Sequence, residues 1–301
     1  MTAQLTEPVE GGGERFSDDA LAAVRLHPRF GEAVRSCITV GLELCRERAV
    51  HRLNRDLGHY LLAILAIHVH VAGGLSLGRL QELCVETGLC SRDRAIALFL
   101  LLRTMRFIHP LPRRGDQRVR WFAPTPALMV AFRARMAGDL AAAVMIRPEA
   151  QAALDRIDEE ALFNSFMRTF GEGVIAAARV HQPRDPSLEM FSGAAGGMMM
   201  LYEIMLTGEE GDLMPPRGRV RISVNALSRT CRISRAQVLK LLRRAEAVDF
   251  LRRDAADGSG VLQPALIAEI ELYFALMFLS LTHCARMAMI ETSQVRTAER
   301  R

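Results

Sequence analysis

The chain has 301 residues, of which 50% are hydrophobic and only 6% aromatic, and its formal net charge is +5. This length allows two domains, and abundant Ala, Leu, Met and Arg beside few β-branched and aromatic residues favour helices over a large sheet. No apolar run reaches the roughly 18 residues that a membrane span needs. The composition therefore indicates a mainly helical globular protein, and we predict no contact with a membrane.

The first 17 residues are predicted to form a disordered leader. They combine a triple glycine with acidic side chains and lack the basic start and apolar core of a signal peptide, so we expect a cytoplasmic protein. The six cysteines are scattered without a CxxC pair, and His68 and His70 point to different sides of a predicted helix. We expect reduced thiols, no metal site and no cofactor.

Positive charge is concentrated in two stretches of the chain. Residues 91–121 carry eight arginines against two aspartates, a net charge of +6. Residues 217–253 carry ten arginines and the only lysine against two acidic residues, a net charge of +9, which leaves −10 for the rest of the chain. This distribution is typical of a protein that binds a polyanion.

The two basic stretches contain related sequences. The segment "SRDRAIALFLLLRTMRFI" (91–108) aligns without gaps to "SRAQVLKLLRRAEAVDFL" (234–251). Each follows a short helix-like segment and a tight turn, and each precedes a turn-rich segment and the tripeptide "PAL". Because proline suits the first helical turn, each "PAL" is expected to begin a long apolar helix. Identical residues occupy the aligned positions 91/234, 92/235, 98/241 and 107/250.

This alignment predicts that the chain is internally duplicated. In chain order, each half is expected to contain helices, a helix-turn-helix, a short hairpin and a long closing helix. We place the first repeat at residues 18–147, the second at residues 148–292 and a flexible tail at residues 293–301.

A helix-turn-helix followed by a β-hairpin is the winged-helix arrangement. The turns "TGLCSRD" and "TCRISRA" and the segment "RRGDQRVRWFAPTPAL", with Asp116, Arg118 and Thr125, resemble the multiple antibiotic resistance regulator (MarR) family. Members of that family are generally homodimers with one winged helix per subunit. The resemblance implies a mainly α fold in which two tandem winged helix-turn-helix units, with flanking helices and small β-hairpin wings, pack as a pseudo-twofold dimer. It also implies control by a small-molecule effector.

The second copy has a helix suited to reading bases. At 100° per residue, one face of this helix is apolar, and the opposite face is centred on Ala236, Lys240 and Arg243. Ser234 is a good N-cap, and free N–H groups at a capped N-terminus favour a phosphate. Basic and amide groups on the outward face suit the major groove of duplex DNA. The predicted core positions are Val238, Leu241, Leu242 and Ala245, and Gln237 and Arg244 flank the outward face.

The first copy lacks such a face. The aligned positions place Asp93, Ala97 and Leu100 outward, and Arg94 and Leu101 flank them. An acid and exposed leucines read bases poorly, so only Arg92 and Arg94 are expected to contact phosphates. The wing of this copy, residues 112–121, is basic, and arginine at a wing tip can enter a narrow minor groove.

We therefore predict a transcriptional regulator that contacts double-stranded DNA mainly through helix 234–248 and wing 112–121. The alternative is a non-catalytic interaction module, in which Ala97, Leu100 and Leu101 dock a protein partner. We expect no enzyme, because no phosphate loop, nucleophile elbow or paired metal carboxylates occur in the sequence. The predicted DNA contacts are Arg92, Arg94, Arg113, Arg114, Arg118, Arg120, Arg232, Ser234, Arg235, Gln237, Lys240, Arg243 and Arg244.

Overall fold

The computed structural model describes residues 16–112, 119–180, 188–209, 211–254 and 257–299. Most of the predicted leader, residues 1–15, lies outside the described residues. Ser17, the last residue of that prediction, caps the first helix by accepting a hydrogen bond from the Ala20 N–H at 3.2 Å. The protein is mainly helical with two small antiparallel sheets, which confirms the predicted mainly α class.

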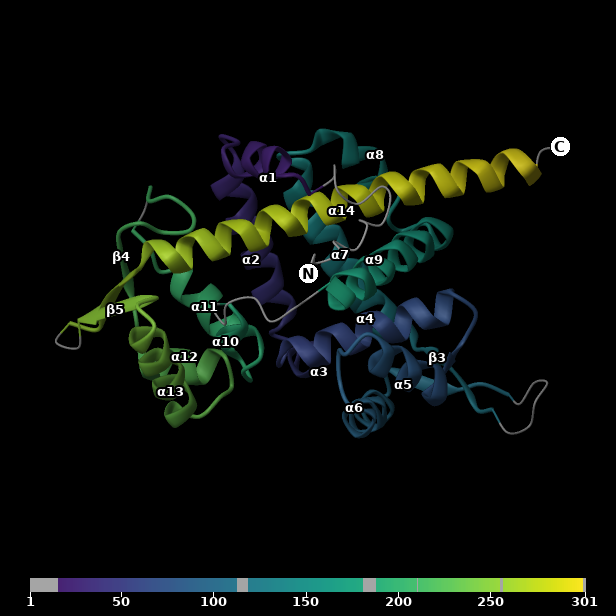
Figure 1. Cartoon of the computed structure of the whole chain (residues 1–301), viewed down its shortest axis with the longest axis horizontal. Helices are drawn as coiled ribbons and strands as arrows, with labels where there is room; N and C mark the ends of the chain where they lie inside the picture. Colours follow the sequence, from purple (N-terminus) through teal and green to yellow (C-terminus); the bar gives the residue numbers. More distant parts are fainter. Residues whose placement is uncertain (1–15, 113–118, 181–187, 210, 255–256, 300–301) are drawn as a thin grey trace, which may run out of the picture.

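The first half of the chain contains seven of the helices that the structure describes, together with one sheet (Figure 1). The order of its elements is α1 (Asp18–Arg25), α2 (Phe30–Leu44), α3 (Arg48–Leu53), α4 (Leu57–Val71), β1 (Leu75–Ser76), α5 (Leu77–Glu86), α6 (Arg92–Thr104), β2 (Ile108–Pro110), β3 (Trp121–Pro124) and α7 (Pro126–Val144). A short 3-10 turn (Pro148–Ala150) and α8 (Gln151–Leu154) join it to the second half.

The second half presents the same kinds of element in a similar order. These elements are α9 (Glu160–Val180), α10 (Glu189–Ser192), α11 (Gly197–Met205), β4 (Arg219–Arg221), α12 (Val224–Thr230), α13 (Arg235–Ala247), β5 (Leu251–Asp254), β6 (Ser259–Leu262) and α14 (Pro264–Glu299). The strand orders correspond, β1-β3-β2 in the first half and β4-β6-β5 in the second. Each long helix that follows a sheet starts with the proline of a "PAL" tripeptide.

The helices of the two halves pack into one core. Within each half the early helix packs on the closing helix, α2 on α7 and α9 on α14. Contacts between the halves are reciprocal, because α4 packs on α9 while α11 packs on α2, and the closing helices α7 and α14 also touch. In Figure 1, α14 crosses the molecule above two groups of short elements, α12 and α13 toward one end and α5 and α6 toward the other.

Of the predicted flexible tail at residues 293–301, the described part is helical, because α14 continues to Glu299. Ala, Glu and Arg are strong helix formers, and here they extend a helix that the core has already nucleated. The segment Pro264–Thr297 is also long and apolar enough to cross a membrane by length and composition, but half of its most apolar window is buried inside the protein.

A polar cluster is buried where α2 and α7 meet. The Arg135 guanidinium donates from Nε to Asp139 Oδ2 at 2.7 Å, and the Cys37 thiol donates to Asp139 Oδ1 at 3.0 Å. Burial raises the pKa of Asp139, while the charge of Arg135 opposes that shift. Gly41 lies opposite, and a methyl group there would sit 2.0 Å from Arg135 Nη1. The absence of a side chain at this position therefore makes room for the ion pair.

Replacing Asp139 with Ala should reduce the free energy of unfolding by about 3–5 kcal/mol, because it leaves the largely buried guanidinium of Arg135 without its counter-charge. Urea denaturation followed by circular dichroism would measure this loss. The exposed Asp158→Ala variant is the control and should stay within about 0.5 kcal/mol of the wild type. Equal stability of the two variants would contradict a structural role for the pair.

Candidate nucleic-acid interface

Helix α13 has the two faces that its sequence predicts. The Ser234 hydroxyl accepts a hydrogen bond from the Gln237 N–H at 3.1 Å and so caps the helix. Lys240 and Arg243 are exposed, and Gln237 is half-buried. Exposed with them are Ala236 and Arg244, whereas the four predicted core positions Val238, Leu241, Leu242 and Ala245 are all buried, as expected.

The basic side chains of α13 are electrostatically uncompensated. None of its four cationic residues forms an ion pair with any described residue. The one acid of the helix, Glu246, is instead held by Arg253 of β5 through two hydrogen bonds of 2.7 and 2.6 Å. This bidentate pair removes the negative charge of Glu246 from the outward face and fixes the helix to the sheet. The four cationic residues are Arg235, Lys240, Arg243 and Arg244.

Helix α6 has the same backbone features but a different outward face. Ser91 accepts from the Arg94 N–H at 3.3 Å, as Ser234 does in α13. After each helix the aligned residues Arg106 and Asp249 have positive φ angles of 57° and 54°. Leu100 is 48% exposed, and Asp93 and Ala97 are exposed beside it, whereas Leu101 is half-buried. The outward face of α6 is therefore apolar and acidic, as predicted.

The remaining predicted contacts fall into three groups. Arg92 and Arg94 are exposed at the start of α6, and Arg94 Nη2 lies 3.8 Å from Asp56 Oδ1. Arg232 is exposed, but its Nη2 donates to the Arg46 carbonyl at 2.8 Å, so this side chain also fixes the turn before α13. Arg120 stands 5.9 Å from the Phe122 ring centroid, a cation–π contact. The other predicted wing arginines, Arg113, Arg114 and Arg118, lie outside the described residues.

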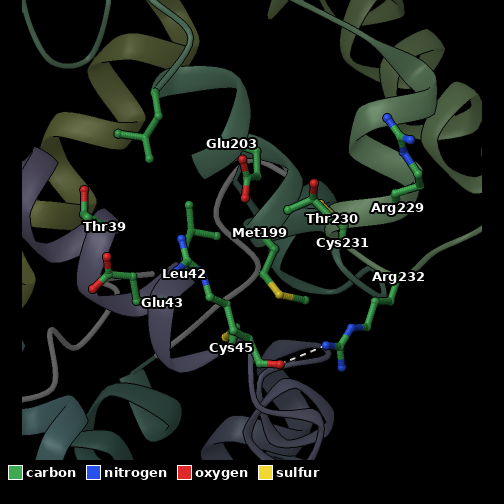
Figure 2. A pocket seen from close by; sticks show the side chains of 12 residues that line it. Thr39, Leu42, Glu43, Cys45, Met199, Glu203, Arg229, Thr230, Cys231 and Arg232 are labelled. Atoms are coloured by element: carbon green, nitrogen blue, oxygen red, sulfur yellow. Dashed lines mark hydrogen bonds between the residues drawn. The ribbon is translucent and has the colours of Figure 1, made fainter.

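A cavity of about 510 Å³ lies beside the turn that precedes α13. Its walls come from α2, α11 and the end of α12, so it borders elements from both halves of the chain (Figure 2). Glu203 contributes a carboxyl whose pKa is raised by burial and lowered in turn by the nearby Arg46. The lining residues are Thr39, Leu42, Glu43, Cys45, Arg46, Met199, Glu203, Leu206, Arg229, Thr230, Cys231 and Arg232. The sequence did not predict this cavity, because its walls are far apart in the chain.

The same turn is anchored by a buried histidine. His51 of α3 places Nε2 at 3.1 Å from the Cys231 carbonyl oxygen, and the neutral ring donates this hydrogen bond when Nε2 carries the proton. Burial is the main cause that lowers the pKa of His51, and the charges of Arg232 and Arg55 act in the same direction.

The His51→Gln variant should remove one source of acid sensitivity. An unfolded His has a pKa of about 6.5, whereas the pKa of His51 in the folded protein is lower. When the pH falls through about 6.5, the unfolded chain therefore binds a proton that the folded chain does not, and the folded state loses stability. Wild-type stability should therefore fall relative to the variant when the pH is lowered from about 7.5 to about 5.5. Urea titrations at both pH values measure this difference, and a constant difference would contradict the burial of a neutral imidazole.

The chain was also compared with known proteins. No family model, curated protein or solved structure matches it.

Proposed function

We propose that this protein is a DNA-binding transcriptional regulator that reads duplex DNA chiefly through α13. The observation that carries the proposal is the outward face of this helix, where Lys240 and Arg243 are exposed and have no acidic partner among the described residues. A solvated helix face usually intersperses acids and bases, which form pairs along the helix. An unpaired basic face on a helix with a capped N-terminus instead complements the phosphates and base edges of a major groove.

The proposal includes two winged helix-turn-helix units in a MarR-like pseudo-dimer. Its support is that each half has a strand, two short helices and a hairpin with the same strand order. The serine caps and positive φ angles at aligned positions also agree with a duplicated unit. The reciprocal packing of α4 on α9 and of α11 on α2 is the pattern that a twofold relation produces.

Roles within α13 follow from position along the helix. Residues in its first turns approach the bases most closely, so Gln237 and Lys240 are assigned to base edges and Ser234 and Arg235 to a phosphate. Arg243 and Arg244, one turn further along, can reach the opposite strand's backbone or a guanine edge. Arg232 approaches the same backbone while its guanidinium holds the turn.

The first unit is assigned a different task. Exposed Asp93 would repel phosphates, while Ala97 and Leu100 offer no hydrogen bonds to bases. Arg92 and Arg94 at the helix start and Arg120 in the wing remain available for phosphate contacts. The apolar face formed by Ala97, Leu100 and Leu101 is proposed to receive a protein partner, since the exposed Leu100 and the half-buried Leu101 adjoin one another and would lose apolar surface to water on association.

Control by a small-molecule effector is part of the proposal. The cavity of about 510 Å³ is in the size range of small-molecule sites. Because it borders both α2 and the turn that carries α13, a ligand that bound more tightly to one position of α13 than to another would shift the helix toward that position. Its carboxyl and guanidinium groups favour a polar ligand with both donor and acceptor atoms.

A non-catalytic interaction module is the second candidate function. It is favoured by the same exposed Leu100, which is 48% accessible. The two candidate functions make different demands on the outward face of α13. A DNA-binding protein needs basic side chains there, whereas a protein-interaction module does not need Lys240 and Arg243 together on a face without acidic partners among the described residues. The dependence of binding on salt also separates them, since phosphate contacts release counterions and apolar contacts do not.

The Lys240→Ala/Arg243→Ala variant should bind duplex DNA at least about 30-fold more weakly than the wild type, because two lost contacts at about 1–3 kcal/mol each cost at least about 2 kcal/mol. Gel-shift titration measures the affinity, and thermal unfolding should be unchanged because both side chains are exposed. The control is Arg35→Ala/Arg286→Ala, which removes the same charge from exposed sites on the helical body. Equal affinities for the wild type and the α13 variant would refute the groove assignment.

A further inference from the structure

The segment between α2 and α4 is attached to both α6 and α13. On one side it touches the turn before α13, through His51 Nε2 at 3.1 Å from the Cys231 carbonyl and through the Arg46 carbonyl, which accepts from Arg232 at 2.8 Å. On the other side, Asp56 Oδ1 lies 3.8 Å from Nη2 of Arg94 in the first turn of α6. The short helix α3 therefore belongs to the segment that joins the turn before α13 to the start of α6, and Figure 1 shows α3 between α13 and α6.

Helix α3 is amphipathic despite its length of six residues. Val50, His51 and Leu53 are buried, whereas Arg48 and Arg52, one turn apart, are exposed on the other face. Arg55 follows just after the helix, with an exposed side chain and a carbonyl that accepts from the Gly196 N–H at 2.7 Å. The buried face fixes the orientation of the helix, so the arginines are held at a defined place.

In the described part of the chain, these three arginines lack the ion pairs that several exposed arginines on the other helices form. None of Arg48, Arg52 and Arg55 forms an ion pair with a described residue. By contrast, the exposed Arg29 pairs with Glu32 at 2.8 Å. The exposed Arg296 likewise pairs with Glu159 at 2.7 Å. Three uncompensated guanidinium groups between two helix-turn-helix segments form a local excess of positive charge.

We propose that α3 is a further DNA-contacting element, in which Arg48, Arg52 and Arg55 bind backbone phosphates between the grooves approached by α6 and α13. This inference rests on the proposed function. Helices of this kind present their N-terminal residues to the groove, so the segment 46–56, which touches the start of α6 and the turn before α13, lies over the intervening duplex. The guanidinium groups are complementary in charge to phosphates, which carry no sequence information. Helix α3 therefore contributes affinity and spacing but no base preference.

The test uses the full chain with Arg48→Ala, Arg52→Ala and Arg55→Ala combined, and a mixed-sequence duplex of about 40 base pairs, which spans several helical turns. Affinity is measured by fluorescence anisotropy over a range of salt concentrations. The triple variant should bind at least about tenfold more weakly, and the slope of log affinity against log salt should fall in magnitude by about 2–3, as expected for three lost phosphate contacts. The equivalent triple lysine variant should retain most of the wild-type affinity, because it keeps the charge.

The matched control combines Arg29→Ala, Arg35→Ala and Arg286→Ala, which removes the same net charge from exposed positions on the helical body. This control should leave the salt slope unchanged. A wild-type slope in the α3 variant, beside weaker binding by the α13 variant, would overturn the role of α3 and leave the proposed function standing. Absence of duplex binding by the wild type would overturn both. A lysine variant as weak as the alanine variant would overturn the charge-based role of α3.

Discussion

Burial of the apolar face of α14 against helices from both halves is the interaction on which the rest of the structure depends. Phe274 and Phe278 of this helix are fully buried, and Phe278 meets Phe30 of the first half edge to face, with ring centroids 6.2 Å apart. Because α14 also packs on α7 and α9, the separation of α6 from α13 is set by a continuous core. Close-packed interiors resist deformation, so without a bound ligand the core holds the two helices at a defined spacing.

This shared core explains why α6 and α13 have the same backbone features although the side chains on their outward faces differ. The cap serines, the buried stripe and the positive-φ residue after each helix all belong to the inward or terminal parts of the helix, where packing and backbone geometry restrict the side chain. The outward positions have no such restriction, and there Lys240 and Arg243 of α13 stand where α6 has Ala97 and Leu100. Under the proposed function, a duplex bound across both helices is therefore read unequally, with bases read under α13 and with phosphates or a protein partner contacted at α6.

Much of this arrangement could be predicted from the sequence, because it follows from local periodicity. The buried stripe of α13, the exposure of Leu100 and the serine caps follow from helical spacing alone. The cavity and the position of α3 could not be predicted in this way, since both depend on contacts such as that between His51 and Cys231, 180 positions apart. The sequence contains the basic run "RERAVHRLNR" at residues 46–55, but only the contacts of this segment with the turn before α13 and with the start of α6 distinguish it from an ordinary solvated face. The continuation of α14 beyond residue 292 was missed because its polar end resembles a tail.

The most direct test of the account is selection of bound fragments from a random DNA pool by the full chain. We predict an enriched DNA site in which base preferences cover the one major-groove segment that α13 reads, next to a stretch of duplex that is bound without base preference. We also predict that the enriched site is protected from cleavage over a longer region than the preferred bases. An inverted repeat with equal preferences in both halves would contradict the assignment of base reading to α13 alone. No enrichment and no retained duplex would contradict the DNA-binding function itself.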